Sequence, residues 1–301
     1  MKITFEEIPQ LPSLDLLAKN LVEGFITGLH KSPFHGFSVE FAEHRLYNAG
    51  ESTKHIDWKV FARTDKLFTK QYDEETNLRA YLMIDNSSSM YYPDQLNSKI
   101  KYSVILAACI SYLLQKQRDA VGMISFSDQI DQMTEVKSTK AHLRNLFNNY
   151  QNLIDQKKSL AKTLLADTIH HVAEKIHKRS LVIIFSDLLT SKNELDNFFQ
   201  AIQHLKHKKH EVLFFQVNDQ QTEFNLSLDD KPYIFEDLET GDRLKLNPGQ
   251  ARDWYKKEVA GYFKDIALKC QQYKIDLTKI DVSDDIEKAL ASFLIKRNKM
   301  R

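Results

Sequence analysis

The alternation of strand-like and helix-like segments after residue 78 constrains the fold of this chain more than any other feature. RAYLMID (79–85), SLVIIFSD (180–187) and HEVLFFQV (210–217) are short runs rich in apolar and β-branched residues. Such runs are typical of parallel strands that are buried on both faces. Segments with apolar residues at helical spacing lie between them, for example at 99–117 and 194–207. The pattern predicts an α/β fold with a doubly wound, mostly parallel sheet covered by helices on both faces.

Three segments add detail to this arrangement. QIDQMTEV, at 129–136, follows a predicted strand after a tight connection and indicates an antiparallel edge strand. KPYIFEDLETGDRLKLNPG, at 231–249, predicts an inserted β-hairpin before a long helix at 253–273. Ser283 is a candidate N-cap for a last helix at 283–296.

The residues before position 78 do not follow the alternation. They contain a helical opening and then short strand-like pieces, so we expect a β-rich leader at 1–77 and a main domain at 78–301. We also expect the leader strands and the inserted hairpin to share a small β subdomain. Trp58 is expected to pack inside the leader, since large aromatic side chains mostly serve cores, and Asp57 is expected to pair with Arg63 or Arg45. A binding surface formed by this block is the alternative.

Composition excludes several classes of protein. The 42 Lys and Arg residues nearly cancel the 41 Asp and Glu residues, which argues against binding to nucleic acid or an anionic membrane. Cys109 and Cys270 belong to no zinc or disulfide spacing, which suits a reducing compartment. The longest apolar run is too short to span a bilayer, and the first ten residues lack the apolar stretch of a signal peptide. We expect a cytoplasmic protein.

Polar residues follow two of the predicted strands directly. The first strand ends in Asp85-Asn86-Ser87-Ser88-Ser89, Asp187 follows a second strand, and Thr163 precedes the helix that leads into that second strand. Ligand crevices of doubly wound sheets lie at the carboxyl ends of the strands, so these side chains are expected to meet. Their oxygens suit a divalent cation, first Mg²⁺ and alternatively Mn²⁺ or Ca²⁺. The predicted metal ligands are Asp85, Ser87, Ser89, Thr163 and Asp187.

Two other interpretations of this loop are open. Asp85 and the serines are also the residue types that cap helices and form turns. A magnesium-dependent phosphatase also places an aspartate after its first strand. The haloacid dehalogenase pattern needs a second aspartate two residues later as general acid, and this chain has Ser87 there. No lysine is evident near the loop from sequence order. We therefore expect a binding protein rather than an enzyme.

A run of histidines offers a competing metal site. His204, His207 and His210 lie in HLKHKKH at spacings near a helical turn. The neighbouring lysines repel a cation, so these histidines are expected to lie on the solvated end of a helix.

The segment HRLYNAGESTKHIDWKVFARTDKLFTKQYDEETNL, at 44–78, resembles the signature of the bacterial family catalogued as domain of unknown function 58 (DUF58). Its most specific parts are Ile56-Asp57-Trp58-Lys59 and Ala62-Arg63-Thr64. The resemblance continues through the metal loop, Ser98-Lys99, DAVG at 119–122 and HKRSLVIIFSDLL at 177–189. The D-x-S-x-S loop, with a later threonine and aspartate, is similar to the metal-ion-dependent adhesion site of von Willebrand factor A domains. The chain departs from the family at Asn48-Ala49-Gly50-Glu51 and at the lysine-rich lead-in to Thr163.

This resemblance implies a von Willebrand A-like fold and a role in metal-dependent protein–protein interaction. Asp85, Ser87 and Ser89 would form the direct cradle, Asp187 would hold the metal directly or through water, and Thr163 would join when a partner binds. An acidic residue of the partner would complete the coordination. Family members are generally encoded beside MoxR-type AAA+ ATPases, which implies work with such an ATPase in complex maturation or stress response.

Overall fold

A computed structural model of the chain describes residues 13–30, 44–46, 58–70, 78–93, 98–156 and 165–300. The chain divides into two compact units. One contains Met1–Ile26 and Leu78–Arg301, and the other contains Thr27–Asn77. The candidate metal residues all belong to the first unit.

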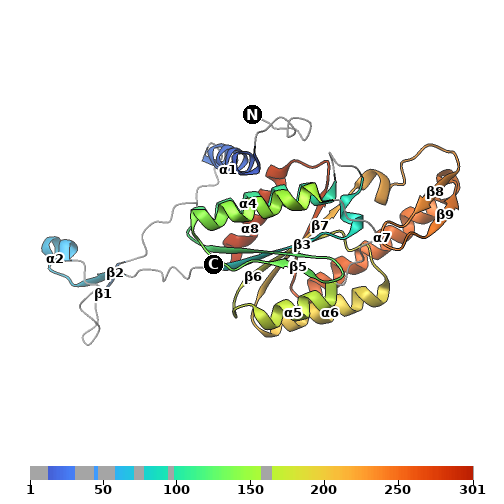
Figure 1. The fold of residues 1–301 in the computed structure, drawn as a ribbon. Coiled ribbons are helices and arrows are strands. Elements are labelled where there is room, and N and C mark those ends of the chain that lie inside the picture. The colour runs from blue at the N-terminus through green and yellow to red at the C-terminus, as the bar shows by residue number, and fades with distance from the viewer. Residues whose placement is uncertain are drawn as a thin grey trace. The chain divides into compact units, whose positions relative to one another are not determined.

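The first unit is built on a six-stranded sheet (Figure 1). Its strands are β3 (Arg79–Asp85), β4 (Ala120–Phe126), β5 (Ile130–Met133), β6 (Leu181–Ser186), β7 (Glu211–Asn218) and β10 (Asp276–Asp281). Their spatial order is β10-β7-β6-β3-β4-β5, and only β5 runs antiparallel to its neighbour. If the six strands are numbered 1 to 6 along the chain and read from the β5 edge, their order is 3-2-1-4-5-6, which is the order of doubly wound folds. The predicted fold class, including the antiparallel edge strand, is confirmed.

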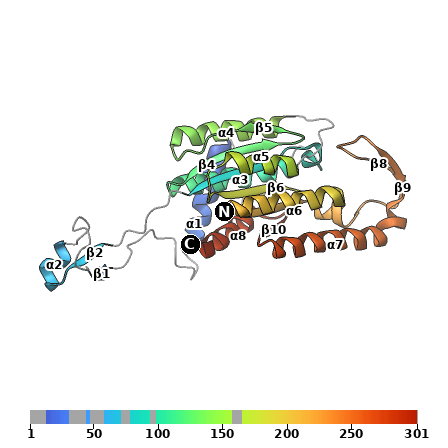
Figure 2. The same ribbon diagram turned by 90° about the horizontal axis from the view of Figure 1, so that it is seen from below.

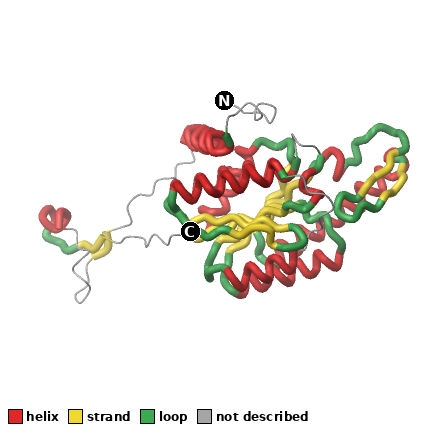
Figure 3. Tube along the Cα trace, viewed as in Figure 1, coloured by secondary structure: helices red, strands yellow, loops and turns green. Residues whose placement is uncertain are grey.

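Helices cover both faces of this sheet (Figures 1 and 2). One face carries α3 (Lys99–Lys116), α4 (Lys140–Asp155) and α8 (Ile286–Met300). The other carries α5 (Leu165–Lys175), α6 (Lys192–His207) and α7 (Pro248–Gln272). Figure 3 shows the strands sandwiched between the two helical layers. The central strand β6 is buried along its whole length, as its unbroken apolar sequence predicts.

Helix α3 is the central helix of its layer and the most deeply buried. Small residues Ala107 and Ala108 are fully buried in it, so its backbone approaches the sheet closely. Ser98 caps its first turn by accepting a hydrogen bond from the Lys101 backbone N–H at 3.4 Å. The N-terminal helix α1 (Leu14–His30) reaches this layer through Glu23, which accepts a hydrogen bond from the Tyr112 hydroxyl at 2.9 Å.

The prediction that the leader strands and the inserted hairpin share one β subdomain is wrong. Among the described residues, the strands of the inserted hairpin, β8 (Tyr233–Glu236) and β9 (Arg243–Leu246), pair only with each other, and the hairpin belongs to the first unit. The leader strands β1 (His44–Leu46) and β2 (Phe68–Lys70) form another two-stranded sheet in the second unit. Each pair is antiparallel and forms a separate two-stranded sheet.

Two expectations about single residues are also wrong. Helix α8 begins at Ile286, and the Ser283 hydroxyl instead donates to Asp281 Oδ1 at 2.9 Å, which ties Ser283 to a turn. Trp58 opens α2 (Trp58–Thr64), where its side chain contacts the Phe61 ring edge-on and is 60% exposed. Asp57 lies outside the described residues.

The histidine run divides between two environments. His207 is exposed near the end of α6, as expected. His210 is buried just before β7, where its Nδ1 accepts a hydrogen bond from the Ser180 backbone N–H at 3.2 Å. The expectation of a solvated surface is therefore wrong for His210, because the helix ends before it. No helix among the described residues is long and apolar enough to cross a membrane.

Candidate functional site

The candidate site lies where the strand order of the sheet reverses. Strand β3 pairs with β4 on one side and with β6 on the other, and chain connections leave this point in opposite directions. Asp85 is the last residue of β3, and Asp187 directly follows β6. The topology thus brings the two carboxylates to adjacent positions at the carboxyl edge, as the sequence predicts.

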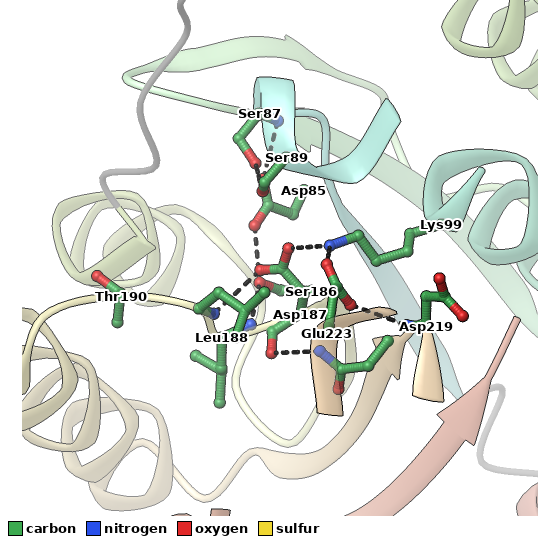
Figure 4. Close-up of polar contacts among 12 residues, drawn as sticks. Asp85, Ser87, Ser89, Lys99, Ser186, Asp187, Leu188, Thr190, Asp219 and Glu223 are labelled. Carbon is green, nitrogen blue, oxygen red and sulfur yellow. Dashed lines mark hydrogen bonds and ion pairs between the residues drawn. The ribbon is translucent and has the colours of Figure 1, made fainter. Parts of the chain in front are cut away.

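Asp85 is fully buried and held by two hydrogen bonds (Figure 4). Its Oδ1 accepts from the Ser87 backbone N–H at 3.0 Å, and its Oδ2 accepts from the Ser186 hydroxyl at 2.7 Å. Burial raises the pKa of Asp85 to about 7, and the negative charge of Asp187 adds to this rise. Among the described residues, no Lys, Arg or His forms an ion pair with the Asp85 carboxylate that would offset this rise.

The hydroxyls of Ser87 and Ser89 form a hydrogen bond with each other, with an oxygen–oxygen distance of 3.1 Å (Figure 4). Ser87 precedes the short 3₁₀ helix η3 (Ser88–Tyr91), yet its side chain makes no capping hydrogen bond there. Ligand oxygens at right angles around Mg²⁺, each about 2.1 Å from the ion, lie about 3 Å apart. The spacing of the two hydroxyls therefore fits one edge of such an octahedron. Ser89 is partly exposed, while Ser87 is buried.

Asp187 is paired with a buried lysine from the start of α3. Lys99 Nζ lies 2.7 Å from Asp187 Oδ2 and also contacts Glu223 Oε1. Burial alone would lower the pKa of Lys99, but the Asp187 and Glu223 carboxylates outweigh it and raise that pKa. Among the described residues, Asp85, Asp187 and Glu223 bring three carboxyl groups to this cluster and Lys99 brings one ammonium group, so carboxyl groups are in excess.

The turn after β6 holds Asp187 in place. Leu188 has a φ of 53°, in the left-handed region that costs a bulky residue energy. The Tyr262 hydroxyl, from α7, donates to the Leu188 carbonyl at 2.7 Å. The Leu189 backbone N–H donates to Asp187 Oδ1 at 3.1 Å, which leaves Oδ2 directed at Lys99.

A cavity between α5 and α6 adjoins Asp187. Its volume is about 320 Å³, and Ser186 and Asp187 form part of its wall. The buried side chains of Leu165, Leu188 and Phe198 supply its apolar lining.

Of the five predicted ligands, the structure brings together Asp85, Ser87, Ser89 and Asp187 (Figure 4). Thr163 lies outside the described residues. Across the part of the chain that the structure describes, no three His, Cys, Asp or Glu side chains converge in a way that could hold a metal ion. A cation at this edge would therefore depend on the serine hydroxyls as well as the carboxylates.

Sequence reasoning missed Lys99, Ser186 and Glu223. The expectation that no lysine lies near the loop is wrong, because α3 places Lys99 beside Asp187 in the folded chain. One signal was available. A basic residue in the first turn of a helix opposes the helix dipole, so Lys99 needed an acidic partner. Glu223 lies in the short π-helix η4 (Gln220–Phe224), for which the sequence offers no periodic pattern.

The family model described as "Protein of unknown function DUF58" matches residues 43–262. Uncharacterized protein Rv1480 of Mycobacterium tuberculosis is 24% identical over 260 residues, covering 85% of this chain and 79% of that protein. Uncharacterized protein Mb1516 of Mycobacterium bovis shows the same identity and coverage.

Two solved structures are also similar. The conserved hypothetical protein BatB from Bacteroides thetaiotaomicron is 13% identical, with a TM-score of 0.46 over 74% of this chain and 99% of that chain. The SpRpn10 VWA domain is 11% identical, with a TM-score of 0.34 over 48% of this chain and 77% of that chain.

Proposed function

The chain belongs to the family described as Protein of unknown function DUF58, and from that premise we propose that it is a protein-interaction module that binds its partner through a divalent cation. Mg²⁺ is the proposed ion, because every donor of the set is an oxygen. The proposed partner is a protein that presents an acidic residue, and the family resemblance points to a MoxR-type AAA+ ATPase.

The observation that carries the proposal is the arrangement around Ser87 and Ser89. Their hydroxyls have the spacing of two neighbouring ligands of Mg²⁺, next to the buried Asp85 carboxylate. A divalent cation there would offset the excess of carboxylates over ammonium groups in the cluster. Binding would also lower the cost of keeping Asp85 ionised in a buried position.

Each residue has a separate proposed role. Asp85, Ser87 and Ser89 hold the ion directly, and Asp187 holds it directly or through a water molecule. Thr163 joins the coordination when the partner binds. The partly exposed Ser89 marks the side from which an acidic residue of the partner approaches. When bound, the ion supplies a positive charge that is not fully neutralised, and this charge attracts the partner carboxylate.

Titration calorimetry with Mg²⁺ and Mn²⁺ tests the site. We expect Asp85→Asn to abolish binding and Ser89→Ala to weaken it by about tenfold or more, because each removes a proposed ligand. Asp119→Asn is the control, since Asp119 is also buried but lies just before β4, at the opposite end of the strands; it loses its ion pair with Arg297, so its stability is measured alongside its affinity. Circular dichroism checks that each variant is folded. Equal affinity of Asp85→Asn and the wild type would refute the site.

A pulldown with a purified MoxR-type ATPase tests the partner. The complex should form with Mg²⁺, dissociate with chelator and fail with Asp85→Asn. Capture that survives both the chelator and this substitution would count against metal-dependent recognition.

A magnesium-dependent phosphatase is the second candidate, favoured by the buried lysine beside the carboxylates. Phosphatases of that kind use a lysine as a positive charge beside the aspartate. Lys99, however, already forms ion pairs with Asp187 and Glu223. Position 87 still holds a serine where the general acid would be needed. Metal-dependent release of phosphate that is lost in Asp85→Asn would favour the enzyme over the binding module.

A further inference from the structure

The Lys99 side chain raises a question about the proposed site. Its ammonium is fully buried and occupies one oxygen of Asp187, which is a proposed ligand of the cation. A buried ammonium needs a carboxylate partner, because burying an unpaired charge costs roughly several kcal/mol of folding free energy. Lys99 therefore cannot simply be displaced into an apolar environment when a metal ion arrives.

Glu223 supplies a second partner for the same ammonium. Its Oε1 contacts Lys99 Nζ, while its Oε2 accepts a hydrogen bond from the Asp219 backbone N–H at 2.8 Å. The main chain of η4 is fixed in turn by the Tyr255 hydroxyl, which donates to the Glu223 carbonyl at 2.8 Å. Glu223 is thus held in position independently of Asp187 (Figure 4).

Loss of the Lys99–Asp187 ion pair and loss of the Lys99–Glu223 ion pair would have different consequences for the buried ammonium. Without Asp187, Lys99 and Glu223 remain as a neutral buried pair. Without Glu223, Lys99 depends on Asp187 alone, and this carboxylate cannot be released to a cation without leaving the lysine unpaired. An ammonium and a divalent cation that share one carboxylate also repel each other.

We propose that Lys99 competes with the divalent cation for Asp187, and that Glu223 is a positioning residue that retains the Lys99 ammonium when the cation takes Asp187. This inference rests on the proposed function. It assigns a regulatory role to two residues outside the predicted ligand set. It also links occupancy of the metal site to η4 and, through Tyr255, to helix α7.

A double-mutant cycle measured by calorimetry with Mg²⁺ tests this inference. Lys99→Gln should tighten binding by about tenfold or more, because the competing charge is removed. Glu223→Gln should weaken binding by about tenfold, because Lys99 then holds Asp187. In the Lys99→Gln background, Glu223→Gln should change the affinity by less than about twofold.

Measuring Glu223→Gln with and without Lys99 distinguishes competition by Lys99 from the mere loss of the Glu223 negative charge. If Glu223 only added negative potential, its substitution would weaken binding equally with and without Lys99, and the inference would be overturned. Lys116→Gln, near the exposed end of the same helix, is the control and should leave the affinity unchanged.

Two further outcomes keep the inference apart from the proposed function. If Lys99→Gln does not fold, the comparison uses the variant that carries both Lys99→Gln and Glu223→Gln. This double variant should bind Mg²⁺ more tightly than Glu223→Gln alone, and weaker binding by the double variant overturns the inference. If the wild type binds Mg²⁺ but Lys99→Gln does not tighten it, only the inference fails. If the wild type binds neither Mg²⁺ nor Mn²⁺, the proposed function fails, and the inference fails with it.

Discussion

Individual buried polar residues carry most of the distinctive chemistry of this chain. Asp85, Asp187 and Lys99 are all buried, and their hydrogen bonds and ion pairs link three separate segments of sequence. Burial makes each charge sensitive to its neighbours, since solvent does not screen them. The same principle applies to His210, which lies outside the candidate site.

His210 should make the stability of the protein depend on pH. Burial lowers the pKa of His210 from its usual value of 6.5, since a charged ring there would lose its hydration. The unfolded chain therefore takes up a proton near pH 6.5 while the folded chain resists it. Stability is complete above this pH and falls as the pH drops below it.

Urea unfolding between pH 7.5 and pH 5 measures this effect. We expect His210→Asn to reduce the loss of unfolding free energy on acidification, because Asn Oδ1 can still accept the hydrogen bond from Ser180 without titrating. His207→Asn, at an exposed position, should leave the pH dependence as in the wild type. If both variants behave alike, His210 is not the responsible group.

At the scale of elements, close packing of backbone decides where glycine is needed. A Cβ atom on Gly122, in strand β4, would lie 2.8 Å from Val136 Cγ1 and 3.2 Å from the Glu135 carbonyl oxygen. The segment after β5 therefore folds back directly over β4. On helix α7, by contrast, a Cβ atom on Gly261 would meet nothing within 4 Å.

The same substitution should thus have opposite effects at these two glycines. Gly122→Ala should destabilise the protein by about 1–3 kcal/mol, since the contacting chain must shift. Gly261→Ala should stabilise it by about 0.5–1 kcal/mol, because alanine favours the helix. Chemical denaturation gives both values, and destabilisation by Gly261→Ala would show that its position is not open.

At the scale of the whole molecule, the strand order converts distant sequence segments into one site. Asp85 and Asp187 are about a hundred residues apart, yet β3 and β6 are neighbours in the sheet. A ligand that binds only this assembled edge should stabilise the entire first unit, because unfolding destroys the site.

Thermal unfolding with increasing Mg²⁺ measures this linkage. At a free metal concentration about 100 times the Kd, the expected gain is about 2.7 kcal/mol of unfolding free energy, seen as a higher Tm. Asp85→Asn should gain nothing, and chelator should return the wild type to its original Tm. An equal rise in wild type and variant would indicate metal binding elsewhere.

Much of the fold was predictable because it depends on local pattern. Unbroken apolar runs predicted the buried parallel strands, and the short connection before Ile130 predicted the antiparallel β5. The least accurate predictions concerned helix ends and small sheets. A side chain such as Ser283 can bond locally either as a cap or in a turn, and residue type alone does not choose between them.

The doubly wound fold and the grouping of Asp85, Ser87, Ser89 and Asp187 follow from the amino-acid sequence, since strand ends and chain order place these residues at one edge of the sheet. The charge balance at that edge depends on tertiary packing. Lys99 contacts Asp187 and Glu223 across 88 and 124 residues of sequence, and Ser186 contacts Asp85 across 101 residues. Because such contacts depend on how α3 and η4 pack against the sheet, no sequence spacing encodes them directly.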